Sequence, residues 1–369
     1  MQVIHWDTRM AGLEGVPRVP FGAVMGPAED QMQFLRQMRR FGFAIVTGAP
    51  ADDDDAVLAL GNSIGHVRDT NYGSSFTVED SPDPTNLAYT RAPLQLHTDN
   101  PYRDPCPGIQ LLHCQTPAPE GGDSVLVDGF AVAERLREEH PEAFAILSTT
   151  SRPWRYVDVK LTTDLRASAC PIVVDAAGGR VVAVSHNNRS AAPLTDLPAD
   201  QVKAFYAAMR KFHRLLTHAD FRLELKLAAG DVLVLANNRV LHGRTGWDMA
   251  CARRLRGTYV DSDALWSRLA ALEQRPRTAA DRADEVLAMI ATTKQHEYGE
   301  NVDMLAHALQ AAELATQSGA DRDVIVAALC HDVGGAEVRT RVCPVTSCCA
   351  RSASFRSPWF VRHVRCGPS

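Results

Sequence analysis

Short apolar stretches recur along most of the chain, and each is bounded by glycine, proline or polar residues. Stretches of this kind are typical of β-strands. We therefore expect strands at residues 41–48, 108–114, 121–128, 155–159, 171–175, 180–186, 223–227, 230–238, 240–244 and 253–261.

Four other segments carry their apolar residues at helical spacing, which is typical of amphipathic helices. Many short strands with few helices favour a β-sandwich or jelly roll over an alternating β-α-β sheet. The expected fold is therefore mainly β with flanking helices, around a jelly-roll (double-stranded β-helix) core. The four predicted helices cover residues 31–40, 53–66, 131–148 and 198–217.

The pattern changes after residue 274. The next residues, 275–281, are polar and contain a proline, as expected of a linker. Helical spacing follows at residues 282–293, 300–317 and 321–331, and beyond residue 334 arginine, serine and cysteine dominate without any period. The sequence predicts three parts, which are a β domain at 1–274, a short all-α segment at 275–335 and an irregular tail at 336–369.

The composition of the 369-residue chain is that of a globular protein, with 45% hydrophobic and 22% charged residues. A net charge of -5 offers no basic surface to nucleic acid. No apolar run approaches the ~18 residues that a membrane span needs, and Met1–Asp7 lacks the features of a signal peptide. Single, scattered cysteines are typical of a reducing cytoplasm, where we expect the protein to work. These cysteines are Cys106, Cys114, Cys170, Cys251 and Cys330.

A candidate metal site begins at His97-Thr98-Asp99. In an extended strand, alternate side chains share a face, so this imidazole and this carboxylate can meet at one ion. By itself the pattern is weak. A second histidine would complete the two-His-one-carboxylate set of non-haem Fe(II) oxygenases. His242 is the candidate, because it follows an apolar strand and precedes Gly243, which allows a neighbouring strand to come close.

Arg253 strengthens this interpretation. It begins the next predicted strand after His242, and its guanidinium suits a bidentate pair with a carboxylate cosubstrate. The set of His97, Asp99, His242 and Arg253, in this order, is far more specific than any one of its members.

The sequence around these residues resembles a known family. His97-Thr98-Asp99, the run Pro107–Cys114 and the run Gly121–Ser124 are similar to the γ-butyrobetaine and trimethyllysine hydroxylases, within the Fe(II)/2-oxoglutarate dioxygenases that include taurine dioxygenase. The resemblance covers roughly residues 20–273. It implies that His97, Asp99 and His242 bind Fe(II), and that the enzyme uses 2-oxoglutarate and O2. It also implies that Arg253 and Ser124 bind 2-oxoglutarate.

The same resemblance implies a small zwitterionic substrate with a quaternary ammonium group. Such a group cannot donate hydrogen bonds, and aromatic faces bind it by cation–π attraction. The positions that match the aromatic cage are Tyr72, Phe76, Tyr89 and Tyr259, with Phe76 where relatives have tryptophan. The positions that match the amides for the anionic end of the substrate are Asn86 and Asn187. Arg189 is an additional cation beside them, and it favours a more highly charged anion such as a phosphonate.

The helical segment shows a second resemblance. Residues 295–301, His307 and residues 328–334 are similar to the start of HD-domain proteins, especially the di-iron oxygenases that cleave 1-hydroxyphosphonates. The resemblance implies metal-site positions at Tyr298, Glu300, His307, His331 and Asp332. The resemblance stops at Gly334, and His363 alone does not restore the later ligands of that family, so we expect a truncated, inactive HD-like segment. The alternative is a small structural appendage.

Together, the two resemblances favour hydroxylation of the compound 2-(trimethylammonio)ethylphosphonate to its 1-hydroxy derivative in phosphonate catabolism. A first alternative is hydroxylation of γ-butyrobetaine to carnitine. A second is an HD-type phosphohydrolase with an N-terminal sensor domain, and a third is a non-catalytic binder of quaternary ammonium compounds. By analogy with the family, we also expect a homodimer.

Overall fold

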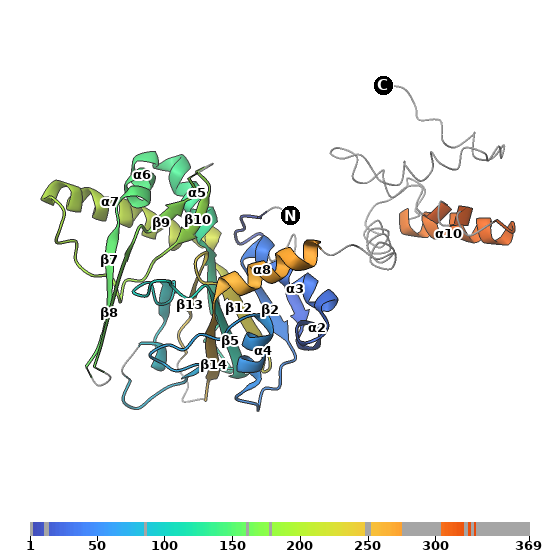
Figure 1. Ribbon diagram of the computed structural model, residues 1–369, viewed down its shortest axis with the longest axis horizontal. Helices are drawn as coiled ribbons and strands as arrows, with labels where there is room; N and C mark the ends of the chain where they lie inside the picture. Colours follow the sequence, from blue (N-terminus) through green and yellow to red (C-terminus); the bar gives the residue numbers. More distant parts are fainter. Residues whose placement is uncertain are drawn as a thin grey trace, which may run out of the picture. The chain divides into compact units, whose positions relative to one another are not determined.

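The computed structural model describes residues 3–10, 15–84, 87–159, 162–176, 179–247, 252–274, 304–320, 324–325 and 328–329 (Figure 1). The chain forms two compact units, Met1–Gln274 and Arg275–Ser369, and each is considered by itself. The assignment of three functional parts to the chain stays a prediction.

Two β-sheets form the centre of the first unit (Figure 1). The larger sheet has the order β1 (Arg18–Pro20), β2 (Phe43–Thr47), β12 (Val232–Ala236), β5 (Ile109–Thr116), β14 (Arg254–Val260) and β3 (Phe76–Val78). The smaller has the order β11 (Leu223–Leu225), β6 (Ser124–Asp128), β13 (Val240–Arg244) and β4 (Leu94–His97). All neighbours are antiparallel except β1 and β2.

The alternation of side chains along the strands determines which face each residue occupies. On β12, Leu233 belongs to a buried cluster that also contains Leu112 of β5 and Leu126 of β6. Its neighbour Val234 belongs to a different cluster, together with residues of the helices. Because the first cluster joins strands of both sheets, the sheets pack face to face, which is consistent with the expected jelly roll. The mainly β fold with flanking helices is confirmed.

Helices cover the outer faces of both sheets. Val234 packs with α2 (Phe21–Met25), α3 (Ala28–Phe41), α4 (Ala56–Ile64) and α8 (Ser262–Gln274) on the larger sheet. On the smaller sheet, Leu241 packs with α5 (Gly129–Glu139), α6 (Pro141–Thr149) and α7 (Ala199–Leu216). The inner faces therefore remain for the contacts between the sheets and for the site.

Two hairpins extend the side of the first unit that carries α5, α6 and α7 (Figure 1). One joins β7 (Arg152–Asp158) to β8 (Thr163–Ala169), and the other joins β9 (Ile172–Val174) to β10 (Val181–Val184). The sequence did not predict β8, because no apolar run marks it and its residues alternate only between half-buried and exposed. Two short 3-10 helices, η1 (Leu87–Tyr89) and η2 (Ala219–Phe221), lie in loops.

The observed helices differ from the predicted ones in two places and agree in a third. The single helix expected at 131–148 is wrong, because α5 ends at Glu139 and Pro141 begins α6. Proline has no N–H to continue a helix and suits a first turn. Helix α8 was not predicted, and α10 (Met304–Gln317) in the second unit confirms the helix expected at 300–317.

The HD-like positions fall mostly on residues that the structure does not describe. His307 lies in α10, whereas Tyr298, Glu300, His331 and Asp332 lie outside the described residues. Within the described ranges, every helix is too short or too polar to cross a bilayer.

Candidate active site

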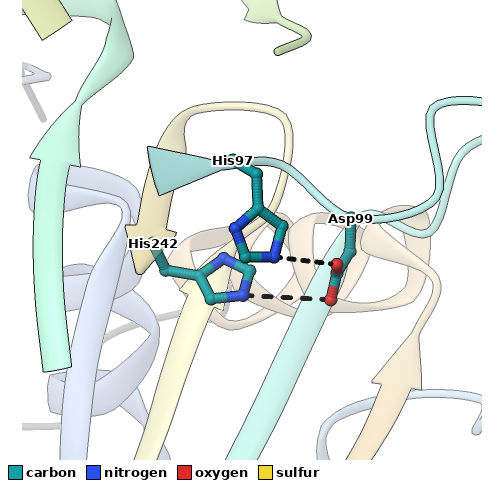
Figure 2. Close-up of side chains that lie close together, drawn as sticks. All are labelled: His97, Asp99 and His242. Atoms are coloured by element: carbon teal, nitrogen blue, oxygen red, sulfur yellow. Dashed lines mark ion pairs between the residues drawn. The ribbon is translucent and has the colours of Figure 1, made fainter. Parts of the chain in front are cut away.

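Three predicted metal ligands meet between the two sheets (Figure 2). His97 ends β4 and pairs directly with His242 of the neighbouring strand β13. Each residue offers one ligand atom, and these atoms all lie within 4.8 Å of one another. The Asp99 carboxylate lies 3.4 Å from Nε2 of His97 and 3.9 Å from Nε2 of His242. Two imidazoles and one carboxylate around one point fit a first-row divalent metal such as Fe(II).

The way in which Asp99 reaches this point differs from the prediction. The sequence interpretation placed His97 and Asp99 on one extended strand, but β4 ends at His97. Asn237, in the turn between β12 and β13, holds the next segment instead. Its Oδ1 accepts a hydrogen bond from the Asp99 backbone N at 2.7 Å, and its Nδ2 donates to the Asp99 backbone O at 2.8 Å. A tertiary contact, and not strand alternation, therefore places this carboxylate.

Outer hydrogen bonds orient two of the three side chains, Asp99 and His97. Oδ2 of Asp99 accepts hydrogen bonds from Nε2 of Gln110 at 2.6 Å and from the Tyr259 hydroxyl at 2.7 Å. Nδ1 of His97 lies 2.8 Å from the Gln95 backbone O, so its Nε2 is the nitrogen left for a metal. A β-carbon at Gly243 would lie 2.6 Å from the Leu94 backbone O, which confirms that glycine allows the close approach of β4.

The pKa values of the three groups suit a ligand set. Burial and, to a smaller extent, the adjacent His97 lower the pKa of His242 to about 3, so this imidazole is neutral. Burial opposes ionisation of Asp99, but pairing with both histidines outweighs it and holds the carboxyl pKa well below its usual range. Burial also disfavours the charged form of His97, yet its bond to Asp99 raises its pKa above the ordinary value. A bound cation would therefore compete with a proton for Nε2 of His97.

The predicted cosubstrate residues line the same cavity. Arg253 directly precedes β14 and is 6% exposed, and Ser124 begins β6 and is 7% exposed. Burial lowers the pKa of Arg253, and within the described ranges no ion pair joins its guanidinium to a carboxylate. A buried arginine in this state can accept a carboxylate ligand, as 2-oxoglutarate would provide.

The cavity has a volume of about 670 Å³ and contains almost every predicted site residue. Asn86 is the exception, because it lies outside the described residues. The predicted residues in the cavity wall are His97, Asp99, His242, Ser124, Arg253, Tyr72, Phe76, Tyr89, Asn187, Arg189 and Tyr259. The cavity is thus large enough for 2-oxoglutarate together with a small substrate.

Aromatic rings form one wall of the cavity. Tyr72 lies 6.1 Å from Phe76, and Phe76 stacks on Tyr259 at 5.3 Å between ring centroids. The ring of Phe76 packs over Gly257 on β14, where a β-carbon would lie 2.4 Å from the ring. The hydroxyl of Tyr259 is already bonded to Asp99, so this residue belongs to both the aromatic wall and the support of the metal site.

The structure adds aromatic residues that the sequence interpretation missed. Tyr156 of β7 lines the cavity, with its ring 6.1 Å from Tyr72 and stacked on Tyr102 at 4.9 Å. Both tyrosines were visible in the sequence, but only the fold of the β7–β8 hairpin brings Tyr156 to the other rings. Gln110 was also missed, because only the folded chain brings it to Asp99.

Two of the three residues predicted for the anionic end of the substrate, Asn187 and Arg189, lie in the described ranges. Oδ1 of Asn187 accepts hydrogen bonds from the backbone N of Arg189 and of Ser190, and its Nδ2 donates to the Thr98 backbone O. One N–H of the Asn187 amide thus remains for a ligand. The exposed Arg189 lines the cavity, and within the described ranges no ion pair joins it to a carboxylate. Burial raises the pKa of Tyr89, and the charge of Arg189 partly offsets that effect.

Comparison with known proteins identifies the family. The model of the taurine catabolism dioxygenase TauD, TfdA family matches residues 8–259. The γ-butyrobetaine dioxygenase of Homo sapiens is 35% identical over 281 residues, which span 73% of this chain and 69% of that protein. The enzyme of the same name from Pseudomonas sp. (strain AK-1) is 35% identical over 271 residues, with the same coverage of 73% and 69%.

Two further comparisons agree with this. The mitochondrial trimethyllysine dioxygenase of Mus musculus is 30% identical over 266 residues, which span 70% of this chain and 62% of that protein. A crystal structure of AAD-2 with Mn(II) and N-oxalylglycine has the same fold, with a TM-score of 0.52, 13% identity and coverage of 64% of this chain and 91% of that one. This chain belongs to the taurine catabolism dioxygenase TauD, TfdA family. It is an Fe(II)- and 2-oxoglutarate-dependent dioxygenase.

Proposed function

We propose that the protein hydroxylates a small zwitterion with a trimethylammonium group at one end and an anion at the other. The single observation that carries this proposal is that an aromatic wall and the three metal ligands share one cavity. The names of the relatives support it, because γ-butyrobetaine and trimethyllysine both carry a trimethylammonium group.

We assign the roles near the metal as follows. His97, Asp99 and His242 hold Fe(II), and Arg253 with Ser124 binds the distal carboxylate of the cosubstrate 2-oxoglutarate. Bound iron supplies the oxidising chemistry, in which 2-oxoglutarate and O2 become succinate and CO2 while one oxygen atom enters a C–H bond of the substrate. The two sheets form the core that positions these residues, and we infer that this core is a jelly roll.

The aromatic residues take the cation. A trimethylammonium group makes no hydrogen bonds to its surroundings, so a polar pocket gains little from it and aromatic faces attract it. Such faces are supplied within the cavity by Tyr72, Phe76, Tyr89, Tyr156 and Tyr259. They hold the head group away from the metal and leave the chain of the substrate to reach towards it.

The two candidate substrates differ in the anion that they carry. The relatives' names favour γ-butyrobetaine, which is a carboxylate. Arg189 favours 2-(trimethylammonio)ethylphosphonate, because an additional cation stabilises a phosphonate more than a carboxylate. The HD-like sequence at 295–334 also favours the phosphonate, since enzymes of that type act on hydroxylated phosphonates.

A substrate panel tests the proposal. The purified protein with Fe(II) and 2-oxoglutarate is given γ-butyrobetaine, 2-(trimethylammonio)ethylphosphonate and 2-aminoethylphosphonate, and succinate and hydroxylated product are measured. We expect turnover of the trimethylammonium compounds and little turnover of the plain amine. The phosphonate assignment fails if γ-butyrobetaine gives the higher kcat/KM, and the whole proposal fails if neither trimethylammonium compound is hydroxylated.

Arg189→Ala separates the two anions. We expect it to raise the KM for the phosphonate by about tenfold or more, since a charge-assisted bond contributes about 1.5–3 kcal/mol, and to change the KM for γ-butyrobetaine less. Arg180→Ala is the matched control, because Arg180 is also exposed but pairs with Asp175 away from the cavity.

The same purified protein can also be used to test the two rival functions. Nucleotide hydrolysis without 2-oxoglutarate would support an HD-type phosphohydrolase with a sensor domain. Tight binding of a trimethylammonium compound without succinate formation would support a non-catalytic binder.

We also propose that the protein works in the cytoplasm and that it forms a homodimer. Unpaired Cys106, Cys114 and Cys170 support the former, and light scattering would test the latter.

A further inference from the structure

A buried arginine with no role in the assignment above lies on the strand that carries His242. Arg244 ends β13, two residues after His242, and is 5% exposed. It lines the cavity, and within the described ranges no ion pair joins its guanidinium to a carboxylate. A buried charge without an acid partner requires other groups to compensate for its lost hydration.

Main-chain carbonyl groups provide that compensation. The guanidinium donates hydrogen bonds to the backbone O of Ala88 and of Ala92, both at 3.0 Å, and to those of Leu87 and Thr90. All four carbonyls belong to residues 87–92, which we call loop 87–92. This loop carries Tyr89, whose ring lines the cavity.

The indole of Trp247 also contacts the guanidinium. The carbon of the Arg244 guanidinium lies 4.5 Å from the centroid of the indole, and that of Arg253 lies 5.3 Å from the same ring. The backbone N of Trp247 also donates to the Arg91 backbone O at 3.2 Å. The arginine is thus fixed between a rigid strand, an aromatic ring and loop 87–92.

We propose that Arg244 is a positioning residue, which holds Tyr89 against the substrate by fixing the carbonyl groups of loop 87–92 to the strand of His242. The inference rests on the proposed function, in which Tyr89 contacts the trimethylammonium group. Arginine suits this position because its planar fork carries five N–H donors in a fixed geometry. Lysine keeps the charge but has three donors on a flexible stem, so it cannot reproduce the pattern.

The first arm of the test needs no substrate or metal. Arg91 is an exposed trypsin site within loop 87–92, so its cleavage rate in the full-length protein reports how firmly the loop is held. We expect Arg244→Lys to be cleaved after Arg91 about tenfold faster than the wild type, as expected from the loss of one to two charge-assisted hydrogen bonds. Arg180→Lys is the matched control and should be cleaved at the wild-type rate. An unchanged cleavage rate in Arg244→Lys would overturn the proposal.

The second arm separates positioning from direct contact. With γ-butyrobetaine and with 2-(trimethylammonio)ethylphosphonate, we expect Arg244→Lys to raise the substrate KM by about tenfold. The KM for the cosubstrate should stay within about twofold, and more succinate should form per hydroxylated product. An equal rise in the KM for the cosubstrate would mean that Arg244 binds 2-oxoglutarate, and would overturn the proposal.

A second variant and the cleavage measurement cover the cases in which Arg244→Lys unfolds or the wild type is inactive. If Arg244→Lys unfolds, Trp247→Phe loosens the arginine without removing it and should show the same pattern at smaller size, and a wild-type pattern there would count against the proposal. If the wild type hydroxylates neither trimethylammonium compound, the proposed function fails, while the cleavage arm still decides whether Arg244 holds loop 87–92.

Discussion

The metal ligands and the substrate wall are built from different parts of the fold. His97 and His242 face each other in register on two neighbouring strands, and bonds from Gln110 and Tyr259 fix Asp99 beside them. The wall instead combines strands with connecting segments, namely Phe76 of β3, Tyr259 of β14, part of the β7–β8 hairpin, a loop with Tyr72 and the short helix η1. The metal ligands thus gather around one pair of strands, whereas the wall is assembled from separate strands, a loop and a short helix.

The difference follows from what each part has to do. Three donor atoms must stay within a few ångströms of one point to bind a small ion, and strands with fixed register provide that precision. A substrate wall only has to match one small molecule, and loops can change without disturbing a core. The same iron chemistry can therefore serve different substrates in one family.

The largest expected effect is on the metal side. Asp99→Ala should lower succinate formation by more than about a thousandfold, because it removes a metal ligand, and even outer contacts of such ligands are typically worth about 10–100-fold. The measurement is succinate release with saturating Fe(II) and 2-oxoglutarate, together with Mn(II) affinity by calorimetry.

Asp196→Ala is the control for that variant, since Asp196 is exposed and bonds only to the neighbouring Thr195 among the described residues. Normal succinate release in Asp99→Ala would contradict the metal assignment. Normal folding with lost Mn(II) affinity would sharpen the contrast between the two regions.

The second effect concerns the cosubstrate. Arg253→Met should raise the KM for the cosubstrate about a hundredfold, because a bidentate charge-assisted pair is lost, and should change the affinity for Mn(II) little. Arg254→Met is the control, since the neighbouring Arg254 is more exposed and pairs with Asp54 at 3.1 Å. If both variants behaved alike, the assignment of Arg253 would be wrong.

A smaller effect, on the KM for the substrate, is expected at the aromatic wall of the cavity. Tyr156→Ala should raise the KM for the trimethylammonium substrate by about 3–30-fold, in line with a cation–π contribution of about 0.5–2 kcal/mol. The KM for the cosubstrate and the affinity for Mn(II) should stay unchanged. Tyr206→Ala is the control, because Tyr206 is 37% exposed on α7. An equal loss of metal affinity would show that the wall and the metal site are one unit.

The smallest effect is on stability, at His186 between the two regions. Its backbone O accepts a hydrogen bond from the Thr98 backbone N at 2.7 Å, and Asn187 follows it. Burial and, to a smaller extent, the nearby His213, Arg152 and His97 together lower the pKa of His186 to about 3. Between the ordinary pKa of about 6.5 and this value, the unfolded chain binds a proton that the folded protein does not.

Stability should therefore fall as the pH drops from 6.5 towards 3, and His186→Gln should remove part of that slope. The difference between the two proteins should approach about 1.4 kcal/mol per pH unit. Urea unfolding of the metal-free proteins at pH 7, 6 and 5 measures it, and parallel slopes would contradict a buried, neutral His186.

Much of the core was predictable from local patterns. The short apolar runs around Leu112, Leu233 and Val240 identified most of the sheets, because strands in the interior bury both faces whatever they pair with. The metal set was also readable, since His97, Asp99 and His242 stand in short, distinctive contexts. Helices were less certain at their ends, as the break at Pro141 shows.

What depended on the tertiary structure is the convergence of distant segments. Asp99 lies beyond its strand and is placed by Asn237, a contact across 138 residues that no local pattern carries. Tyr156 joins the wall only because an unpredicted strand, β8, completes its hairpin. Arg244 looks like any strand-ending arginine until its carbonyl partners, 152–157 residues away, are known. Side-chain periodicity is a local property, whereas register and loop placement result from packing between elements, so they required the folded chain.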